Sequence, residues 1–469
     1  MTGKAGGLSF LELKARMFDG SLLKTVKHIH FIGIGGSGMF PIVQILHSQG
    51  YFITGSDNNE SDTVSLERSM GIPVALGQHA ENIDGADLII YTAAIMADNP
   101  ELIAAKASGV PTVERAEILG YLTSLYSECI CVCGTHGKTT TTAMLTQVLL
   151  GAGLDPTAVI GGKLPLIGGN GRVGESDVMV CEACEFNDHF LQLDPDVAVI
   201  LNVDADHLEY FGTIENIIKS FHTFAGMAKK SVIVNGSNEN SMKAVSGISG
   251  KEIVTFGWEE SCDYSPADIT HEGALSSFDL LHAGKSLGRF TIHVPGRHNI
   301  LNAVAAIAAA IHTGAELPAI AEHLAKFHGA GRRFEILGTV RGVTIADDYA
   351  HHPAELAATL RAAKELPFRE VWAVFQPFTY SRTKMLMDDF ALALALADHV
   401  VMSEIMGSRE KNTYGVYTSQ LAEKIPGSVW FPEFPEIADY VMAHAKPGDL
   451  VLTLGCGDVY KCAKLMLQK

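Results

Sequence analysis

The chain has 469 residues, of which 47% are hydrophobic, enough to bury large cores, and its length predicts about three domains. Its formal net charge of −18 excludes general binding to nucleic acid, because a phosphate backbone requires a basic surface. No apolar run approaches the roughly 20 residues that a membrane span needs, and the cysteines lack the spacing of a secreted disulfide scaffold or a zinc ribbon, so we expect a cytoplasmic protein.

The first strands follow a short N-terminal segment. Residues 1–26 are expected to form a helical extension. From 27 to 127, apolar runs alternate with amphipathic helical stretches, the pattern of a parallel sheet flanked by helices. We predict strands in this segment at 28–32, 51–54 and 88–91.

A glycine-rich loop follows the first of these strands. In the context of strand, loop and helix, such glycines let a diphosphate approach a helix N-terminus. The loop could bind NAD, which would make the chain an oxidoreductase, or another nucleotide diphosphate such as that of a UDP-sugar, or it could be a purely structural corner. Its candidate binding residues are Gly33, Gly35, Gly36, Ser37 and Gly38, with Asp57 at the end of the next strand.

The second segment, 128–331, repeats the alternation. We predict strands at 129–132, 177–181, 197–201 and 231–234, then a more polar, antiparallel stretch at 253–294 and a helix at 299–313.

The most informative motif opens this segment. An apolar strand, 130–133, runs into a glycine loop and then a helical run, 141–150. At such a helix N-terminus, backbone N–H groups and a lysine bind phosphate oxygens, and a threonine hydroxyl reaches magnesium. The strict pattern would place a glycine where the chain has Val132. We nevertheless predict a nucleoside triphosphate site at Gly134, Thr135, His136, Gly137, Lys138, Thr139 and Thr140.

Further polar side chains follow the predicted strands, at the edge where open α/β sheets bind ligands. Glu182 and Glu185 offer carboxylate oxygens, which suit magnesium. His207 ends the run 202–207, but histidine is an unusual magnesium ligand, so its spacing alone favours an ordinary loop residue. Asn299 and Asn302 could contact an adenine edge, although Asn299 could equally cap the helix.

The third segment, 332–469, again alternates apolar strands with helices. We predict its strands at 343–346, 370–375, 399–402 and 450–454.

The order of these motifs resembles that of the Mur ligase family, from about residue 27 to the C-terminus. The segments that carry the resemblance are 33–39, 134–140, 182–185, 206–207, 298–299 with Asn302, 332–335, 347–353, 375–377 with 381–383, and 455–458. The resemblance implies an α/β protein of three domains. These are a UDP-sugar-binding Rossmann-like domain (27–127), a central ATP-binding domain with a mostly parallel sheet (128–331), and a Rossmann-like domain that presents the amino acid (332–469).

The resemblance also implies residue roles. Lys138 would bind the β- and γ-phosphates of ATP, and Arg333 would approach the phosphates. Thr139 and Glu182 would hold one magnesium ion, and His207 a second. Adenine and ribose would be bound by Asn299, Asn302, Arg332 and Asp348, and the incoming amino acid by Tyr349, His351 and Arg382.

The implied activity is ATP-dependent amide formation between L-alanine and the lactyl carboxylate of UDP-N-acetylmuramate, through an acyl phosphate, in a monomer or homodimer. His222 stands where members that add later residues carry a carbamylated lysine, which favours alanine addition. Phe378 stands where many alanine-adding members have histidine. The alternatives are a recycling ligase that adds a tripeptide, an NAD-dependent oxidoreductase, and a non-catalytic ATP-binding regulator.

Overall fold

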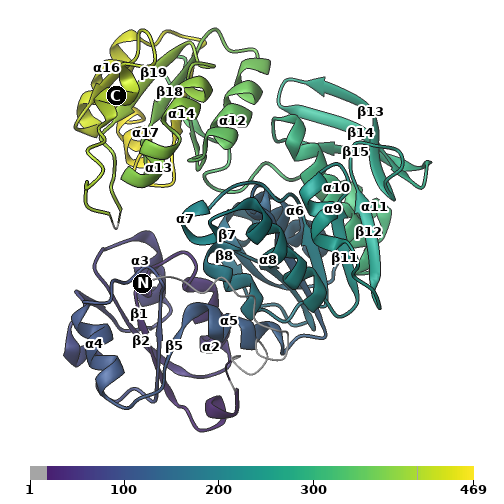
Figure 1. Ribbon diagram of the computed structural model, residues 1–469, viewed down its shortest axis with the longest axis vertical. Helices are drawn as coiled ribbons and strands as arrows, with labels where there is room; N and C mark the ends of the chain where they lie inside the picture. Colours follow the sequence, from purple (N-terminus) through teal and green to yellow (C-terminus); the bar gives the residue numbers. More distant parts are fainter. Residues whose placement is uncertain (1–17, 19, 409) are drawn as a thin grey trace. The chain divides into compact units, whose positions relative to one another are not determined.

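The computed structural model describes residue 18, residues 20–408 and residues 410–469 (Figure 1). Most of the predicted N-terminal extension, residues 1–17 and 19, lies outside the described residues. Its described part contains a short 3-10 helix, η1 (Gly20–Lys24). The chain divides into two compact units. The first holds the described residues up to Ala267 with 279–290 and 301–325, and the second holds 268–278, 291–300 and 326–469.

The first unit begins with a five-stranded parallel sheet in the order β3-β2-β1-β4-β5. Its strands are β1 (His28–Ile32), β2 (Phe52–Asp57), β3 (Val74–Leu76), β4 (Leu88–Tyr91) and β5 (Thr112–Glu114). The helices of this segment are α2 (Phe40–Ser48), α3 (Asp62–Ser69), α4 (Pro100–Ala107) and α5 (Arg115–Thr123). Strand β2 continues beyond its predicted end at residue 54, so that Asp57 is its last residue.

A second sheet has ten strands in the order β15-β14-β13-β12-β11-β10-β6-β9-β7-β8. They are β6 (Glu128–Cys133), β7 (Thr157–Leu164), β8 (Gly169–Arg172), β9 (Val178–Glu182), β10 (Val197–Ile200), β11 (Ser231–Asn235), β12 (Glu252–Phe256), β13 (Tyr264–Glu272), β14 (Leu275–His282) and β15 (Lys285–Ile292). The helices are α6 (Lys138–Gly151), α7 (Leu208–Phe211), α8 (Ile214–Met227), α9 (Glu239–Val245), α10 (Arg297–His312) and α11 (Leu317–Leu324), with 3-10 helices η3 (Pro165–Ile167) and η4 (Phe186–Gln192).

One prediction for this sheet was wrong in part, and one pair of strands was missed. The stretch 253–294 is not antiparallel throughout, because β12 pairs in parallel with β11 and β13. The antiparallel part follows β13, where two-residue connections join neighbouring strands, a link that only antiparallel strands allow. The hairpin of β7 and β8, which is antiparallel, was not predicted.

The second unit contains a six-stranded sheet in the order β16-β17-β21-β18-β19-β20, parallel except for its first pair. Its strands are β16 (Glu335–Val340), β17 (Val343–Asp348), β18 (Val371–Phe375), β19 (His399–Ser403), β20 (Val429–Phe431) and β21 (Leu450–Leu454). The helices are α12 (Pro353–Glu365), α13 (Tyr380–Met385), α14 (Met387–Leu394), α15 (Thr418–Ala422), α16 (Phe434–His444) and α17 (Tyr460–Met466). Two hydrophobic cores, one including Phe375 and Phe390 and one including Val374 and Ile437, belong to this sheet.

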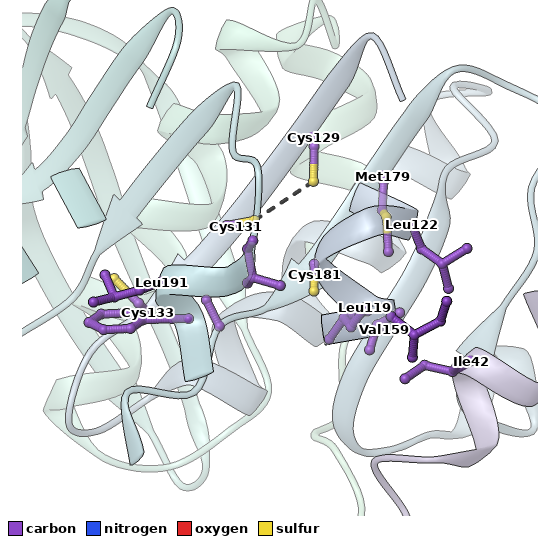
Figure 2. Packing of buried hydrophobic residues seen from close by; sticks show 14 of the residues in the cluster. Ile42, Leu119, Leu122, Cys129, Cys131, Cys133, Val159, Met179, Cys181 and Leu191 are labelled. Carbon is purple, nitrogen blue, oxygen red and sulfur yellow. Dashed lines mark hydrogen bonds between the residues drawn. The ribbon is translucent and has the colours of Figure 1, made fainter. Parts of the chain in front are cut away.

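The first two sheets share one hydrophobic core. Ile42 of α2 and Leu122 of α5 belong to the same buried cluster as Val159 of β7 and Met179 of β9, and Figure 2 shows these side chains together. Helices α2 and α5, which belong to the segment of the first sheet, are therefore packed against strands of the second.

The predicted fold class is confirmed: the protein is mixed α/β with mostly parallel sheets and a small antiparallel part. The predicted limits of the three domains stay a prediction. Across the described ranges, no helix is both long and apolar enough to cross a membrane.

Glu67 on α3 is a buried carboxyl group in the first sheet's segment. Its side chain is inaccessible to solvent, and neither carboxylate oxygen has a hydrogen-bond partner among the described residues. Burial, with a smaller contribution from the charge of Asp57, raises the pKa of Glu67 to about 8.

Replacing Glu67 with glutamine should remove a pH dependence of stability. Between its ordinary pKa of 4.5 and about 8, the folded chain keeps a proton that the unfolded chain has lost. The associated stability is thus complete at low pH and is lost as the pH rises toward 8. Between about pH 5 and about pH 9, the melting temperature of the wild type should fall further than that of Glu67→Gln. An equal fall in melting temperature would contradict the raised pKa of Glu67.

Candidate active site

The second glycine loop joins β6 to α6 and is held in place by a neighbouring strand. Gly134 and Gly137 have φ values of 142° and 87°, a left-handed region that glycine adopts without strain. Asn202, just after β10, accepts a hydrogen bond from the backbone N–H of His136 at 2.7 Å and donates one to its carbonyl at 3.0 Å. The loop is therefore fixed independently of any ligand.

Lys138, the first residue of α6, carries a partly buried charge at the end of this loop. Its Nζ atom lies 2.9–3.0 Å from the two carboxylate oxygens of Glu185 and donates to the carbonyl of Gly134 at 2.5 Å. Burial by itself would lower the pKa of Lys138, but the charge of Glu185, the hydrogen bond to it and the charges of Cys184 and Glu182 together outweigh burial, so the pKa lies above its usual value. Lys138 therefore carries a positive charge at neutral pH, at the point where the loop enters α6.

Thr139 and Glu182 form a second contact at the loop. The Thr139 hydroxyl donates to Glu182 Oε1 at 3.1 Å, and the backbone N–H of Gly161 donates to Glu182 Oε2 at 2.7 Å. A Cβ atom on Gly161 would lie 2.5 Å from Glu182 Oε2. Only glycine at residue 161 therefore leaves this carboxylate in place.

His207 lies on the other side of the loop. Because β6 lies between β9 and β10, the loop is flanked by Glu182 at the end of β9 and by 201–207 after β10. His207 has a left-handed φ of 52°, and its ring lies 4.8 Å from that of Phe186. In the part of the chain that the structure describes, no three His, Cys, Asp or Glu side chains cluster as a metal site.

The two asparagines on α10 differ in their surroundings. A Cβ atom on Gly137 would lie 2.5 Å from Asn302 Oδ1, so Asn302 lies against the glycine loop, and its contact with adenine stays a prediction. Helix α10 begins at Arg297 rather than Asn299, so the alternative of Asn299 as the helix cap was wrong. The Asn299 amide instead donates to the carbonyl of Pro295 at 2.7 Å.

The first glycine loop is shaped by β2. The backbone N–H groups of Gly33 and Ile34 donate to the carbonyl of Ser56 at 2.8 and 3.0 Å. Asp57 Oδ2 accepts from the backbone of Gly35 at 3.1 Å, and a Cβ atom on Gly35 would lie 2.6 Å from Val64. Asp57 thus braces the loop.

In the second unit, Arg332 anchors a turn before β16. Its Nε atom donates to Asp347 at 2.8 Å, and its guanidinium carbon lies 5.0 Å from the ring of Tyr349 and 4.9 Å from that of Tyr460. The guanidinium carbon of Arg333 lies 5.2 Å from the Tyr349 ring. Tyr349 is therefore the common neighbour of both arginines.

Asp348 is more enclosed than a ribose-binding carboxylate is expected to be. Its oxygens accept from the backbone N–H groups of Phe334 and Ala350, each at 2.8 Å. Burial raises the pKa of Asp348 to about 6, although the charge of Arg333 opposes this shift.

His351 lies just before α12, next to Tyr349. Its Nδ1 atom lies 3.0 Å from the Tyr349 carbonyl and 3.3 Å from a carboxylate oxygen of Glu355. Arg382 is on α13, after β18. Phe378 lies between β18 and α13 and is half-buried.

Models of three protein domains match the chain. The model described as "Mur ligase family, catalytic domain" matches residues 28–127, "Mur ligase middle domain" matches 132–310, and "Mur ligase, glutamate ligase domain" matches 332–457.

Two relatives named UDP-N-acetylmuramate–L-alanine ligase extend this match along nearly the whole chain. That of Caldanaerobacter subterraneus subsp. tengcongensis is 42% identical and covers 95% of this chain and 98% of its own. That of Agathobacter rectalis is 44% identical and covers 94% and 98%.

The chain belongs to the Mur ligase family.

A solved structure agrees with this membership. The crystal structure of UDP-N-acetylmuramate-alanine ligase from Thermotoga maritima matches with a TM-score of 0.82 and 30% identity, and the match covers 94% of this chain and 98% of that one. Mur ligases depend on ATP, which agrees with the triphosphate loop. The first glycine loop lies inside a Mur ligase domain, so the oxidoreductase alternative has no support.

Several residues that build the site were not predicted from the sequence. Asn202 was noted only as part of a run, and Gly161 and the β7–β8 hairpin were missed. The run 157–164 is apolar in its first half and ends before proline, a pattern that would have indicated a strand. The contact of Gly161 with Glu182 had no local signal.

Placing a methyl group at residue 161 should impair the use of magnesium. In Gly161→Ala the Glu182 carboxylate must move, and losing such an outer contact typically costs about 10- to 100-fold in metal affinity. Titrating ATP turnover with Mg²⁺ should show this shift. Gly226→Ala on α8, where a Cβ atom meets nothing within 4 Å, is the control. An unchanged magnesium requirement in Gly161→Ala would contradict the role of Glu182.

Proposed function

We propose that this chain is an ATP-dependent ligase that joins L-alanine to the lactyl carboxylate of UDP-N-acetylmuramate and releases ADP and phosphate. The observation that carries the proposal is the partly buried pair of Lys138 and Glu185 at the second glycine loop of a Mur ligase. Relatives named for that activity, which match nearly the whole chain, support the choice of substrates.

The donor atoms beside the loop fit magnesium. The Thr139 hydroxyl and the Glu182 carboxylate are oxygen donors that lie together, and magnesium prefers oxygen ligands and completes its shell with water and phosphate. We assign Thr139 and Glu182 to one magnesium ion and His207 to a second. When bound, the ion would neutralise charge on the phosphate oxygens.

The first proposed step is phosphoryl transfer. An oxygen of the lactyl carboxylate forms a bond to the γ-phosphorus, and the bond from that phosphorus to the β,γ-bridging oxygen breaks, so that ADP leaves with the electron pair. Positioning and charge neutralisation do most of this work. Lys138 supplies a fixed positive charge, and Arg333 is assigned to the same phosphates.

The second step is amide formation. The amine of alanine attacks the acyl carbon and phosphate leaves with the C–O bonding pair. The amine must first lose a proton, and His351 is assigned as the base. A carbonyl can only accept, so the short contact to the Tyr349 carbonyl places a hydrogen on Nδ1 and the basic lone pair on Nε2. Arg382 and Tyr349 are assigned to the carboxylate and body of the amino acid.

The remaining predicted contacts complete the nucleotide sites. Asn302 and Asn299 are assigned to adenine, and Arg332 and Asp348 to the adenine plane and ribose. Each oxygen of Asp348 accepts one backbone hydrogen bond, and because a carboxylate oxygen can accept a second, a ribose hydroxyl could be added to these contacts. The first glycine loop, with Gly33, Gly35, Gly36, Ser37, Gly38 and Asp57, is assigned to the UDP diphosphate.

We expect the reaction in the cytoplasm, where free thiols like the eight cysteines of this chain persist, and a monomer or homodimer remains the expected state. A tripeptide as the amine substrate is the second candidate. Single-turnover assays with L-alanine, glycine, L-serine and the tripeptide would separate the two. Turnover with the tripeptide alone would replace the proposal.

Replacing Lys138 with alanine should lower ADP release driven by both substrates by at least about 100- to 1,000-fold, because a preorganised charge is lost at the phosphates. Lys219→Ala, at an exposed lysine of α8, is the control. Since Lys138→Ala leaves Glu185 without its partner, the double variant Lys138→Ala/Glu185→Gln should recover melting temperature but not turnover. Near-normal turnover in either variant would contradict the assignment of Lys138 to the phosphates of ATP.

Replacing Phe378 with histidine tests the alanine pocket. A histidine adds a hydrogen-bonding group that Phe378 lacks, so the KM for alanine should fall or stay unchanged. Steady-state assays with varied alanine would measure it. A large loss of alanine turnover would show that the pocket is built differently.

A further inference from the structure

The proposed reaction requires two substrates that are assigned to different sheets of the first unit to meet. The sugar nucleotide is assigned to a loop on the first sheet and ATP to a loop on the second. Reacting atoms must approach to about 3–3.5 Å, and an error of about 1 Å can cost roughly 100-fold in rate. A contact that sets the spacing of the two loops would therefore control the rate of phosphoryl transfer.

Asn170 on β8 makes such a contact. Its amide nitrogen donates to the carbonyl of Ser37, in the first glycine loop, at 2.5 Å and to the carbonyl of Ile160, on β7, at 3.2 Å. Ile160 lies where the pairing of β7 with β8 is irregular, between Val159 and Leu164. One side chain thus ties the first loop to the irregular part of the β7–β8 hairpin.

The hairpin also reaches the second loop. Gly161 follows Ile160 on β7, and its backbone N–H donates to Glu182, whose other oxygen accepts from Thr139. Hydrogen bonds therefore lead from Ser37 through Asn170, the backbone of β7 and Glu182 to the first turn of α6.

Close packing holds the same hairpin against the helix that follows the first loop. A Cβ atom on Gly171 would lie 2.7 Å from the Cα of Pro41 on α2, so only glycine permits this approach. The pair β7–β8 thus contacts the first segment by backbone packing as well as through Asn170.

A second set of contacts joins the segments of the first two sheets, through residues that follow Glu185 in the chain. His189 on η4 pairs with Glu114, just before α5, at 3.0 Å, and this hydrogen bond lowers the pKa of Glu114. The backbone of Asp194 donates to the hydroxyl of Thr123 at 3.0 Å. These contacts and the shared core hold the two sheets together without Asn170. Replacing Asn170 should therefore alter the distance between the two glycine loops and leave the chain folded.

We propose that Asn170 is a positioning residue, which sets the first glycine loop against the phosphate loop so that the bound sugar acid meets the γ-phosphorus. The proposal rests on the proposed function. It adds a specific residue that is assigned to neither substrate and acts through Ser37 and β7.

The test compares Asn170→Ala with a matched variant of the same strand. Single-turnover ADP formation, with ATP, magnesium, UDP-N-acetylmuramate and L-alanine, should slow about 10- to 100-fold in Asn170→Ala. The KM values for ATP and the sugar nucleotide should stay within about threefold, because neither site loses a contact. Asn170→Asp, which keeps the size but cannot donate to either carbonyl, should be slowed at least as much.

Arg172→Ala is the matched control. Arg172 bonds to Pro156 and Asp155 within the second sheet's own segment, so its loss should lower the melting temperature without slowing the single turnover. An equal slowing in Arg172→Ala would reduce Asn170 to a structural role and overturn the proposal. So would an unchanged rate in Asn170→Ala, or a raised KM for the sugar nucleotide at an unchanged rate. A wild-type chain that forms no ADP would remove the proposed function, and this inference with it.

Discussion

The candidate site depends on a partly buried lysine that keeps its positive charge because a carboxylate lies beside it. Taking an ammonium group out of water is costly unless an opposite charge lies beside it, and Glu185 meets this need for Lys138. The pair holds a positive charge at the end of the glycine loop that we assign to the phosphates of ATP. The parallel alignment of β9, β6 and β10 makes the pair possible, because it brings the ends of three strands to one edge of the sheet.

Two carboxylates near the end of β9, Glu182 and Glu185, have different contacts. Glu185 holds the lysine, whereas Glu182, three residues earlier at the end of β9, faces the Thr139 hydroxyl and the Gly161 backbone. Similar side chains thus have different neighbours. Of the two, we assign only Glu182 to magnesium, because Glu185 forms an ion pair with the ammonium group of Lys138.

Much of the fold was predictable from the sequence, because buried parallel strands are continuous apolar runs between loops. Strands such as β1 and β21 were predicted to the residue. The two glycine loops were also predicted, because glycines cluster directly after an apolar strand. The left-handed φ values of Gly134 and Gly137 are the backbone conformation that requires glycine there. What sequence could not provide were contacts between distant segments: Asn202 with His136, Gly161 with Glu182, and Asn170 with Ser37. These depend on which strands become neighbours, and β8 is too short and too polar, with only Gly169–Arg172, to resemble a strand.

The six-stranded sheet has its own two cores, in a compact unit separate from both glycine loops. Its interior therefore does not depend on the residues of either glycine loop. In evolution, such an architecture lets substitutions accumulate in the six-stranded sheet's segment while the packing around the two glycine loops is inherited unchanged.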